Sequence, residues 1–348
     1  MTLRIATQLQ YAGNPRDAAD QVLALEKAGL DSVWVAEAYG FDSPTLMGYL
    51  AAKTENVKIG SAILNVYSRT PGALLQTAAG LDNVSGGRAI LGLGASGPQV
   101  IEGFHGVPYA KPLARTREVV DIIRRGLQRE PLVHDGEFHL PLDKEHGAVT
   151  GLGKPLKLLT KPERSSIPIW IAALGPKSVE QTAEYADGWI PHLFHPEKSS
   201  LVWGDALAKG TAARPAELGP LNVMAGGMLA IGEGPETKAL LDFARPLFAL
   251  YVGGMGAKGK NFYNDVARSY GYEEEAEKIQ DLYLSGQKKE AEALVPTEWL
   301  EASNLVGPAS YVKERLAAFE EAGVTDINVM PASDDPAATI AELRDLIG

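Results

Sequence analysis

The sequence predicts an α/β fold of the (β/α)8 TIM-barrel type, with insertions. Short apolar runs alternate with amphipathic stretches from the amino terminus, and we count eight such pairs along the chain. A doubly wound sheet usually has five or six strands, so eight pairs favour the barrel. The 348 residues exceed the roughly 250 of a plain barrel. We therefore expect one domain over residues 1–348, with insertions near 130–166 and 245–307.

Apolar runs and end signals place the elements. Strands are expected at residues 3–9, 32–36, 57–65, 88–93, 167–173, 189–191, 222–231 and 326–330. Helices are expected at residues 15–28, 44–53, 71–84, 113–128, 177–186 and 336–347. In the first insertion, Asp135-Gly136 lies between apolar runs and predicts a hairpin over residues 131–140. The second insertion is rich in Lys and Glu and is expected to be helical.

Composition argues against several classes of protein. The net charge of -11 and the pI near 5.1 argue against a nucleic-acid surface, which needs clustered Lys and Arg. The absence of cysteine excludes disulfides, thiolate metal sites and cysteine nucleophiles. The chain enters a strand at once, without a signal-peptide pattern, and no apolar run approaches the roughly 18 residues of a membrane span. We therefore expect a cytoplasmic protein without a membrane partner.

Gly92, Gly94 and Gly97 spell a G-x-G-x-x-G run, the letters of a dinucleotide-binding loop. That motif belongs after the first strand of a βαβ unit, with an acidic residue at the end of the next strand. Here three strand-helix units precede the run, and Glu118 downstream lies in a segment of helical periodicity. The run is better read as a buried strand that ends in a glycine-rich loop, where backbone can approach a ligand closely.

A barrel of this type has its active site at the carboxyl ends of the strands. Candidates in those positions are Gln8, Gln10 and Tyr11, then Glu37, Asn65 and Val66, then Gly94, Ala95 and Ser96, then Ala172 to Lys177, then Pro191 and His192. In Ala172-Ala173-Leu174-Gly175-Pro176-Lys177, small residues end a strand and lead straight into a helix. The free amides and dipole of that helix suit a phosphate. An ordinary tight loop is the alternative.

Two residue types in these loops could move protons. Glu37 ends an apolar strand and could relay a proton, or it could form an ion pair at the rim of the barrel. His192 and His195 have metal-ligand spacing, but no third ligand stands out, so no metal site is predicted. We expect His192 to line the pocket and His195 to face solvent. Lys258 and Lys260 are expected on a solvated helical face, with an anionic ligand tail as the alternative.

Four segments, residues 60–71, 85–97, 97–106 and 186–189, resemble the luciferase-like superfamily, and within it deazaflavin-dependent reductases related to methylenetetrahydromethanopterin reductase. The resemblance covers nearly the whole chain. It implies a barrel with an insertion, a homodimer, and coenzyme F420 or FMN at the strand ends. It also implies a non-prolyl cis peptide, which maps to Asn65-Val66.

The resemblance assigns cofactor contacts to Gly94, Ala95 and Ser96 and to Ala173, Leu174, Gly175 and Pro176; the candidates Asn65, Val66, Ala172, Lys177 and Pro191 complete the predicted set. Sugar-phosphate dehydrogenases of the family carry Asp-His after strand two and Thr-Gly-Glu after strand four. This chain has Glu37-Ala38 and Ala95-Ser96-Gly97 there, so the histidine base and glutamate acid of that subgroup are absent.

We therefore predict an F420-dependent oxidoreductase that transfers hydride between C5 of the deazaflavin and a small organic substrate. Glu37 is the first candidate for proton transfer and His192 the second. An FMN-dependent monooxygenase is the alternative enzyme. An F420-binding protein without turnover is the alternative outside enzymes.

Overall fold

The computed structural model describes residues 2–9, 13–147 and 149–348. By its internal contacts the chain divides into two compact units: residues 1–7, 24–31 and 173–348 form the first unit, and residues 8–23 and 32–172 form the second. β1 (Arg4–Leu9) and α1 (Pro15–Lys27) contribute to both. Gln10 and Tyr11, which the sequence marks as candidate site residues, lie outside the described residues.

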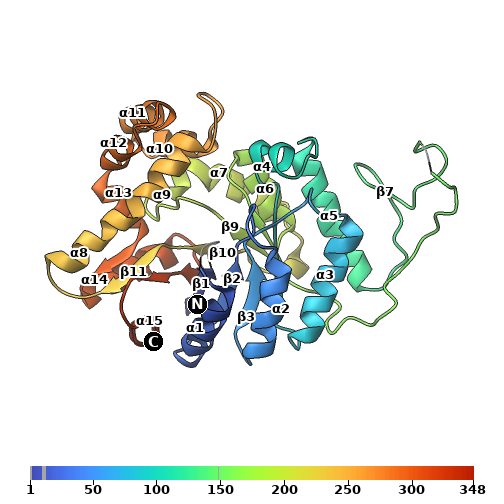
Figure 1. Cartoon of the computed structure of the whole chain (residues 1–348), viewed down its shortest axis with the longest axis horizontal. Helices are drawn as coiled ribbons and strands as arrows, with labels where there is room; N and C mark the ends of the chain where they lie inside the picture. Colours follow the sequence, from blue (N-terminus) through green and yellow to red (C-terminus); the bar gives the residue numbers. More distant parts are fainter. Residues whose placement is uncertain (1, 10–12, 148) are drawn as a thin grey trace. The chain divides into compact units, whose positions relative to one another are not determined.

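The second unit is built on a parallel sheet. Its strands pair in the order β2, β3, β5, β8, and β4 pairs with the end of β5. The strands are β2 (Ser32–Val35), β3 (Lys58–Ser61), β4 (Leu64–Asn65), β5 (Ala89–Gly94) and β8 (Ile169–Ala172). The helices are α2 (Ser43–Lys53), α3 (Pro71–Val84), α4 (Pro98–Gly103) and α5 (Pro112–Leu127). α3 packs between α2 and α5 (Figure 1).

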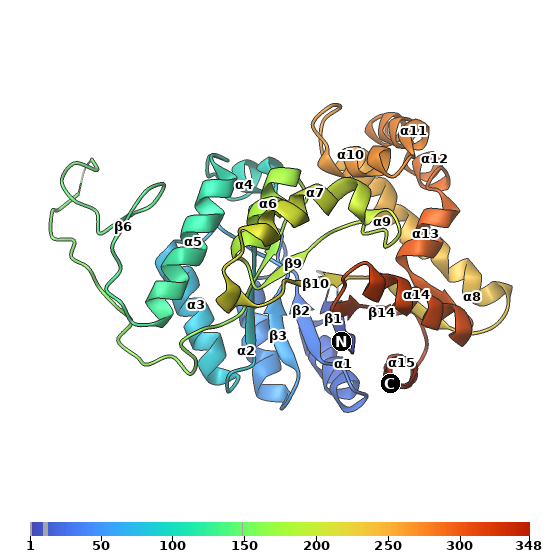
Figure 2. The same ribbon diagram turned by 180° about the vertical axis from the view of Figure 1, so that it is seen from behind.

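Between α5 and β8 the chain forms the first insertion. It contains an antiparallel hairpin, β6 (His134–Asp135) and β7 (His139–Leu140), as the Asp135-Gly136 pair predicts. The rest of the insertion is irregular and extends beyond α5 in Figures 1 and 2.

Two tryptophans fill the core beside the sheet of the second unit. Trp34 of β2 and Trp170 of β8 are buried, with ring centroids 5.0 Å apart. A Cβ on Gly60 would lie 2.4 Å from the Trp34 ring, so only glycine leaves room for that side chain. A Cβ on Gly92 would lie 1.8 Å from the Ser61 carbonyl oxygen. These glycines therefore serve strand packing.

The first unit holds two parallel sheets. In one, the strands pair in the order β1, β13, β10, β9; in the other, β11 lies between β12 and β14. The strands are β9 (Gly188–Ile190), β10 (Asn222–Ala225), β11 (Met228–Ile231), β12 (Leu305–Gly307), β13 (Asp326–Asn328) and β14 (Met330–Pro331).

The helices of the first unit fall into two groups. Those that alternate with its strands are α6 (Pro176–Tyr185), α7 (Ser199–Ala212), α14 (Ala309–Glu321) and α15 (Pro336–Ile347). α6 and α7 lie side by side (Figure 2). Those between β11 and β12 are α8 (Pro235–Ala239), η2 (Leu240–Ala244), α9 (Arg245–Ala249), the π-helical turn η3 (Leu250–Gly254), α10 (Phe262–Ser269), α11 (Glu273–Leu284), α12 (Lys288–Ala293) and α13 (Thr297–Ser303). A short 3-10 turn, η1 (Ala216–Leu218), follows α7.

Three expectations about strands are wrong in detail. The strand expected at 222–231 is two strands, because Gly226 and Gly227 turn the chain from β10 into a different sheet. The strand expected at 57–65 is interrupted after β3, and the strand expected at 326–330 divides into β13 and β14. β12 is a strand at the end of an insertion expected to be helical, and the sequence analysis had left α4, α7 and α14 unassigned.

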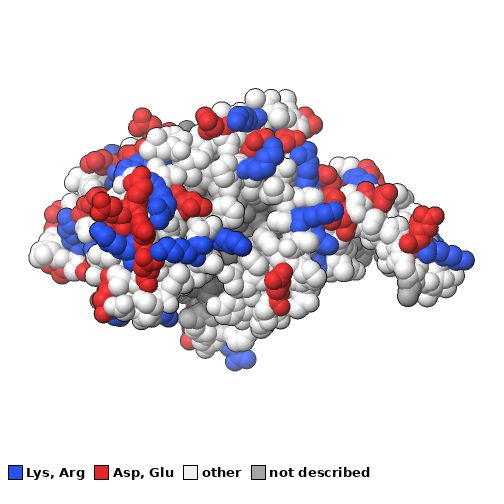
Figure 3. All heavy atoms as spheres, turned by 90° about the horizontal axis from the view of Figure 1, so that it is seen from above, with Lys and Arg blue, Asp and Glu red and all other residues white. Residues whose placement is uncertain are grey.

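No helix among the described residues is long and apolar enough to cross a membrane. On the face drawn in Figure 3, basic and acidic side chains are interspersed without a large field of either sign. That the chain binds no nucleic acid stays a prediction.

Candidate functional site

Glu37, which follows β2, forms a buried ion pair with Arg69. The two guanidinium nitrogens donate to the two carboxylate oxygens at 2.7 and 2.8 Å. The backbone N–H of Ser43 donates to Glu37 Oε2 at 2.9 Å. The hydrogen bond from Arg69 to this carboxylate raises the pKa of Arg69. The rim ion pair is therefore present, and it occupies both oxygens of Glu37. The proton-relay role of Glu37 stays a prediction.

The third predicted strand is interrupted by a bulge between β3 and β4. The non-prolyl cis peptide lies here, at Ala62-Ile63, and the expected position Asn65-Val66 is wrong by three residues. The Ala62 N–H still bonds to the Val35 carbonyl at 2.8 Å, whereas pairing with β5 stops after Gly60 and resumes at Leu64. Ile63 therefore reaches Gly94: a Cβ on Gly94 would lie 3.0 Å from Ile63 Cδ1.

Asn65 is buried at the end of β4 and organises the loop that follows. Its Oδ1 accepts hydrogen bonds from the N–H groups of Tyr67 and Ser68 at 3.1 and 2.7 Å. Its Nδ2 lies 3.3 Å from His105 Nε2, and the Val66 N–H donates to the Gly94 carbonyl at 3.1 Å. Predicted residues Asn65, Val66 and Gly94 are thus brought together in the second unit.

The glycine-rich run after β5 differs from a nucleotide-binding loop. β5 is buried along its length, and Gly97 is the N-cap of the short helix α4. Ser96 is exposed and has a left-handed φ of 57°. Its carbonyl accepts a hydrogen bond from the Tyr109 hydroxyl at 3.2 Å. The residue types alone gave no signal for Tyr109 or His105, because tertiary packing brings both to this loop.

In the first unit, two indoles fix the loop before α6. Trp189 Nε1 donates to the Ala173 carbonyl at 2.9 Å, and Trp203 Nε1 donates to the Leu174 carbonyl at 2.8 Å. Gly175 is the N-cap of α6, and no side chain caps the first turn. The Phe262 ring is 3.5 Å from the position of a Gly175 Cβ. The helix thus starts directly after Gly175, and a phosphate at its start stays a prediction.

The remaining predicted residues around α6 lie as follows. Lys177 points away into solvent and pairs with Glu180 at 2.7 Å. Ala172 ends β8 in the second unit, within van der Waals distance of a Gly94 Cβ position. Pro191 is buried directly after β9.

His192 carries a buried nitrogen that no other described residue bonds. Among the residues that the structure describes, its Nε2 has no hydrogen-bond partner, and its ring lies 3.9 Å from Tyr251 and 5.7 Å from Tyr263 between centroids. Burial lowers the pKa of His192 to about 4, so the imidazole is neutral at pH 7. A neutral imidazole next to two tyrosines can donate or accept a hydrogen bond from a bound molecule.

His195 is buried, and the expectation that it faces solvent is wrong. Its ring packs on Tyr270 at 5.5 Å, and its Nδ1 lies 3.1 Å from Glu197 Oε2. Burial lowers its pKa to about 4 in spite of the opposing effect of Glu197. The i,i+3 spacing from His192 therefore reflects aromatic packing. Among the described residues, neither histidine belongs to a group of three possible metal ligands.

Two buried asparagines hold the π-helical turn that carries Tyr251. Asn261 Nδ2 donates to the carbonyls of Tyr251 and Val252 at 2.9 and 3.0 Å. Asn264 Nδ2 donates to the Val252 carbonyl at 3.1 Å. Asn261 Oδ1 also accepts the N–H of Tyr263 at 3.0 Å. The two asparagines thus position both tyrosines that surround His192, and the contacts that define this motif are tertiary, so residue types alone do not indicate it.

The lysines proposed as receptors for an anionic tail lie at the surface. Lys258 Nζ pairs with Asp281 at 2.6 Å, and this hydrogen bond raises the pKa of Lys258. Lys260 is exposed. The pairing of Lys258 favours the solvated-face interpretation.

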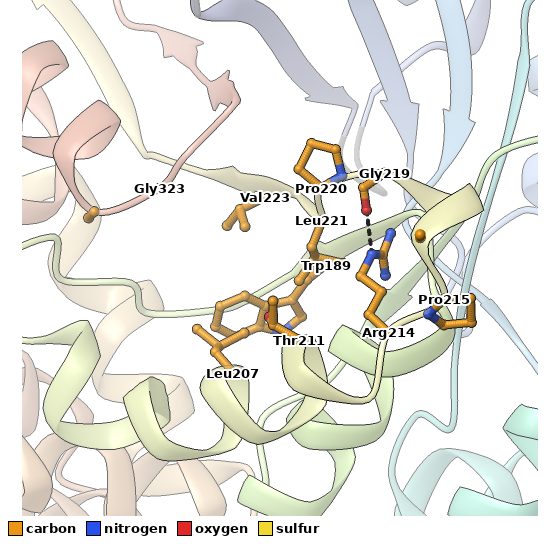
Figure 4. Close-up of a pocket in the computed structure, with 12 residues that line it drawn as sticks. Trp189, Leu207, Thr211, Arg214, Pro215, Gly219, Pro220, Leu221, Val223 and Gly323 are labelled. Carbon is orange, nitrogen blue, oxygen red and sulfur yellow. Dashed lines mark hydrogen bonds between the residues drawn. The ribbon is translucent and has the colours of Figure 1, made fainter.

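Neither of two pockets is lined by a predicted site residue that the structure describes. One, of about 430 Å³ in the first unit, lies beside the amino end of β10 (Figure 4). Its lining is largely apolar and includes Trp189, while Arg214 at its edge donates to backbone carbonyls. The other, of about 460 Å³ in the second unit, lies beside Leu9 and Ala36.

Comparison with known proteins decides the family. The sequence profile described as luciferase-like monooxygenase matches residues 1–326. The chain belongs to the luciferase-like monooxygenase family. A Mycobacterium tuberculosis relative, Rv3520c, named as a coenzyme F420-dependent oxidoreductase, is 39% identical to this luciferase-like chain over 98% of its length and 99% of the relative. The 5,10-methylenetetrahydromethanopterin reductase of Archaeoglobus fulgidus is 28% identical over 87% of the chain and 85% of the relative.

The solved structure of the coenzyme F420-dependent tetrahydromethanopterin reductase from Methanopyrus kandleri matches 99% of this luciferase-like chain and 97% of its own, with a TM-score of 0.80 and 22% identity. The fold is therefore the (β/α)8 barrel of this family, as the sequence predicts. The predicted relationship to the methylenetetrahydromethanopterin reductases is confirmed as well.

Each unit, taken by itself, has features that fit a deazaflavin, two in the first unit and one in the second. His192 Nε2 is a buried polar atom in need of a partner. The first turn of α6 has no side-chain cap, which leaves its amides for an anion. Ser96 and Gly97 present backbone at an open loop, where a Cβ on Gly97 would meet only a Gln99 side chain. The contacts themselves stay predictions.

Proposed function

We propose that this luciferase-like chain is an oxidoreductase that transfers hydride between coenzyme F420 and a small organic substrate. The full-length relationship to Rv3520c, named as an F420-dependent oxidoreductase, carries this proposal. When bound, the coenzyme supplies or accepts the hydride at C5. The protein supplies binding, orientation and exclusion of water.

In this proposal, His192 positions a bound molecule by a hydrogen bond. Its imidazole is neutral at pH 7, so it contributes a directed hydrogen bond without a charge. Asn261 and Asn264 support it indirectly, because they fix the turn that holds Tyr251. The uncapped start of α6, at Gly175 and Pro176, receives a phosphate of the coenzyme. Gly94, Ala95 and Ser96 offer backbone to the ring system.

For proton transfer, the geometry favours His192 over Glu37. Both oxygens of Glu37 accept short hydrogen bonds from Arg69, so this carboxylate is already engaged within the protein. Among the described residues, none forms a hydrogen bond with His192 Nε2.

The test is an anaerobic titration of the full chain with purified F420 and, separately, with FMN. We expect micromolar or tighter binding of F420 and weaker binding of FMN. His192→Leu should weaken F420 binding at least tenfold, whereas Lys289→Ala, a change at an exposed surface pair with Glu292, should leave it unchanged. The absence of F420 binding at micromolar concentrations would overturn the proposal.

An FMN-dependent monooxygenase is the second candidate, because the matching family is described by that activity. Tighter binding of FMN, with oxygen consumption by the reduced complex, would establish it. An F420-binding protein without turnover is the third. Failure to oxidise reduced F420 with any member of a panel of enones, imines and quinones would favour it.

We further propose that the protein acts as a homodimer, as the family resemblance implies, and that it is cytoplasmic, as its composition suggests. Light scattering coupled to size-exclusion chromatography should give twice the 37.1 kDa chain mass. A monomer at working concentration would refute the dimer.

A further inference from the structure

A cluster of possible metal ligands lies in the first insertion. One ligand atom from each of Asp135, His139 and His146 lies within 4.8 Å of the other two. Asp135 is on β6, His139 is on β7, and His146 is in the irregular segment that follows. Three separate stretches of the insertion therefore converge on one point. The sequence analysis identified the hairpin but placed no metal there.

The backbone arranges two of these ligands. Asp135 and His139 are paired across the antiparallel hairpin, which places their side chains on the same face. His139 Nδ1 lies 2.8 Å from Asp135 Oδ1. The short hairpin thus sets the Asp-His pair without the help of any other group.

The third ligand is brought in by its own neighbours. His146 Nδ1 lies 2.6 Å from Asp143 Oδ1, and its ring lies 3.9 Å from that of His139 between centroids. Asp143 Oδ1 also accepts the N–H of Glu145 at 2.9 Å, so a local turn holds it. Two imidazoles and two carboxylates therefore gather in a segment that is otherwise exposed.

This set of donors matches a late first-row divalent ion. Zn²⁺ prefers imidazole and carboxylate ligands in tetrahedral geometry, at bond lengths of about 2.0–2.2 Å. Ligand atoms in such a set are roughly 3.4 Å apart, so the cluster needs only small side-chain rotations. Asp135 is free to make them, since 91% of its side chain is exposed. Two carboxylates balance the charge of the ion.

We propose that Asp135, His139 and His146 bind a divalent zinc-like ion, and that Asp143 orients His146 as a carboxylate partner. The ion ties the hairpin to the segment after it. The insertion has little core of its own, because Leu142, Leu152 and Leu159 are all exposed. A metal ion is a common substitute for a core in such a segment.

The test is calorimetric titration of the full, tag-free and metal-free chain with ZnCl2. We expect one equivalent to bind with a dissociation constant on the order of 1–10 µM. The double variant His139→Ala/His146→Ala should lose at least tenfold in affinity. Glu145→Gln is the matched control, since it removes an exposed carboxylate beside the cluster and should leave affinity unchanged.

Two further measurements separate a built site from loose association. Co²⁺ in place of Zn²⁺ should give the visible absorption of a tetrahedral site, lost in Asp135→Asn. Zn²⁺ should slow proteolytic cleavage within residues 141–160 of the wild type but not of the double variant. Melting curves without metal should coincide, because the substituted side chains make no buried contacts.

Any of three results would overturn the proposal: no binding at about 100 µM Zn²⁺, equal binding by the double variant, or an equal loss in Glu145→Gln. None of them bears on the proposed redox activity.

Discussion

The polar groups around Glu37 and Asn65 differ from those around His192 in how fully the protein bonds them. Glu37 and Arg69 bond to each other, and Asn65 bonds to the neighbouring backbone. His192 Nε2 is buried against aromatic rings and has no hydrogen-bond partner among the described residues. The first group has the character of a scaffold. The second group has the character of a ligand-binding site, because buried polar atoms without a hydrogen-bond partner are rare in folded proteins.

The largest expected effect comes from breaking the ion pair between Glu37 and Arg69. Among the described residues, Arg69→Met leaves the side chain of the buried Glu37 with hydrogen bonds only from the N–H and hydroxyl of Ser43. We expect a loss of about 3–5 kcal/mol in the free energy of unfolding, measured by urea denaturation. Glu37→Gln/Arg69→Met should lose clearly less, since no unpaired charge remains. Equal losses would show that the ion pair does not hold this region.

Asn65→Ala tests how much the hydrogen bonds of Asn65 stabilise the loop after β4. The substitution strands the N–H groups of Tyr67 and Ser68, and we expect a loss of about 2–3 kcal/mol by the same measurement. Asn65→Asp keeps the acceptor and should lose less. If Ala and Asp behave alike, the loop does not depend on the Oδ1 acceptor.

His192 should make the free energy of unfolding depend on pH. The pKa of His192 is lowered from 6.5 to about 4 in the folded protein, so between these values the unfolded chain binds more protons. Stability should therefore be complete above pH 6.5 and fall as the pH drops towards 4. Between neutral pH and pH 5, the free energy of unfolding should fall in both proteins. We expect the fall to be about 1–2 kcal/mol smaller in His192→Leu than in the wild type. His195 contributes in the same direction and window, so a slope remains in the variant.

At neutral pH, the same His192→Leu change should alter stability by less than about 1 kcal/mol, because no hydrogen bond within the protein is broken at Nε2. A loss as large as that of Asn65→Ala would mean that the imidazole is structural. The comparison between the two regions would then fail.

Lys177→Ala should have the smallest effect. Its pair with Glu180 is an exposed contact three residues apart, worth less than about 0.5 kcal/mol. A salt-dependent loss of F420 affinity in this variant, without a loss of stability, would show that Lys177 turns from Glu180 to the coenzyme.

Some elements could be predicted from the sequence to the residue, because local chemistry defines their ends. α3 and α15 have the predicted bounds: Thr70 and Asp335 cap them with side-chain oxygens, and Pro follows each cap. The break in the strand expected at 222–231 had a local signal, the Gly226-Gly227 pair, but the close approach of Asn328 and Asn304 to these glycines depends on tertiary packing.

The candidate site divides in the same way. The residues that follow strands were found, because strand ends can be predicted from apolar runs. The burial of His195 was missed because it depends on Tyr270, 75 residues further along the chain. The cis peptide lies at Ala62-Ile63, three residues before the position that the family resemblance implies.

The three glycines of the run after β5 differ sharply in the substitutions they should accept. The Ser61 carbonyl oxygen lies where a side chain on Gly92 would begin, so no residue other than glycine fits there. Gly94 is limited by Ile63, a flexible side chain that a second substitution could shorten. Gly97 faces only Gln99. A library designed to alter coenzyme preference should therefore keep Gly92 fixed, vary Gly94 together with Ile63, and randomise Gly97 freely.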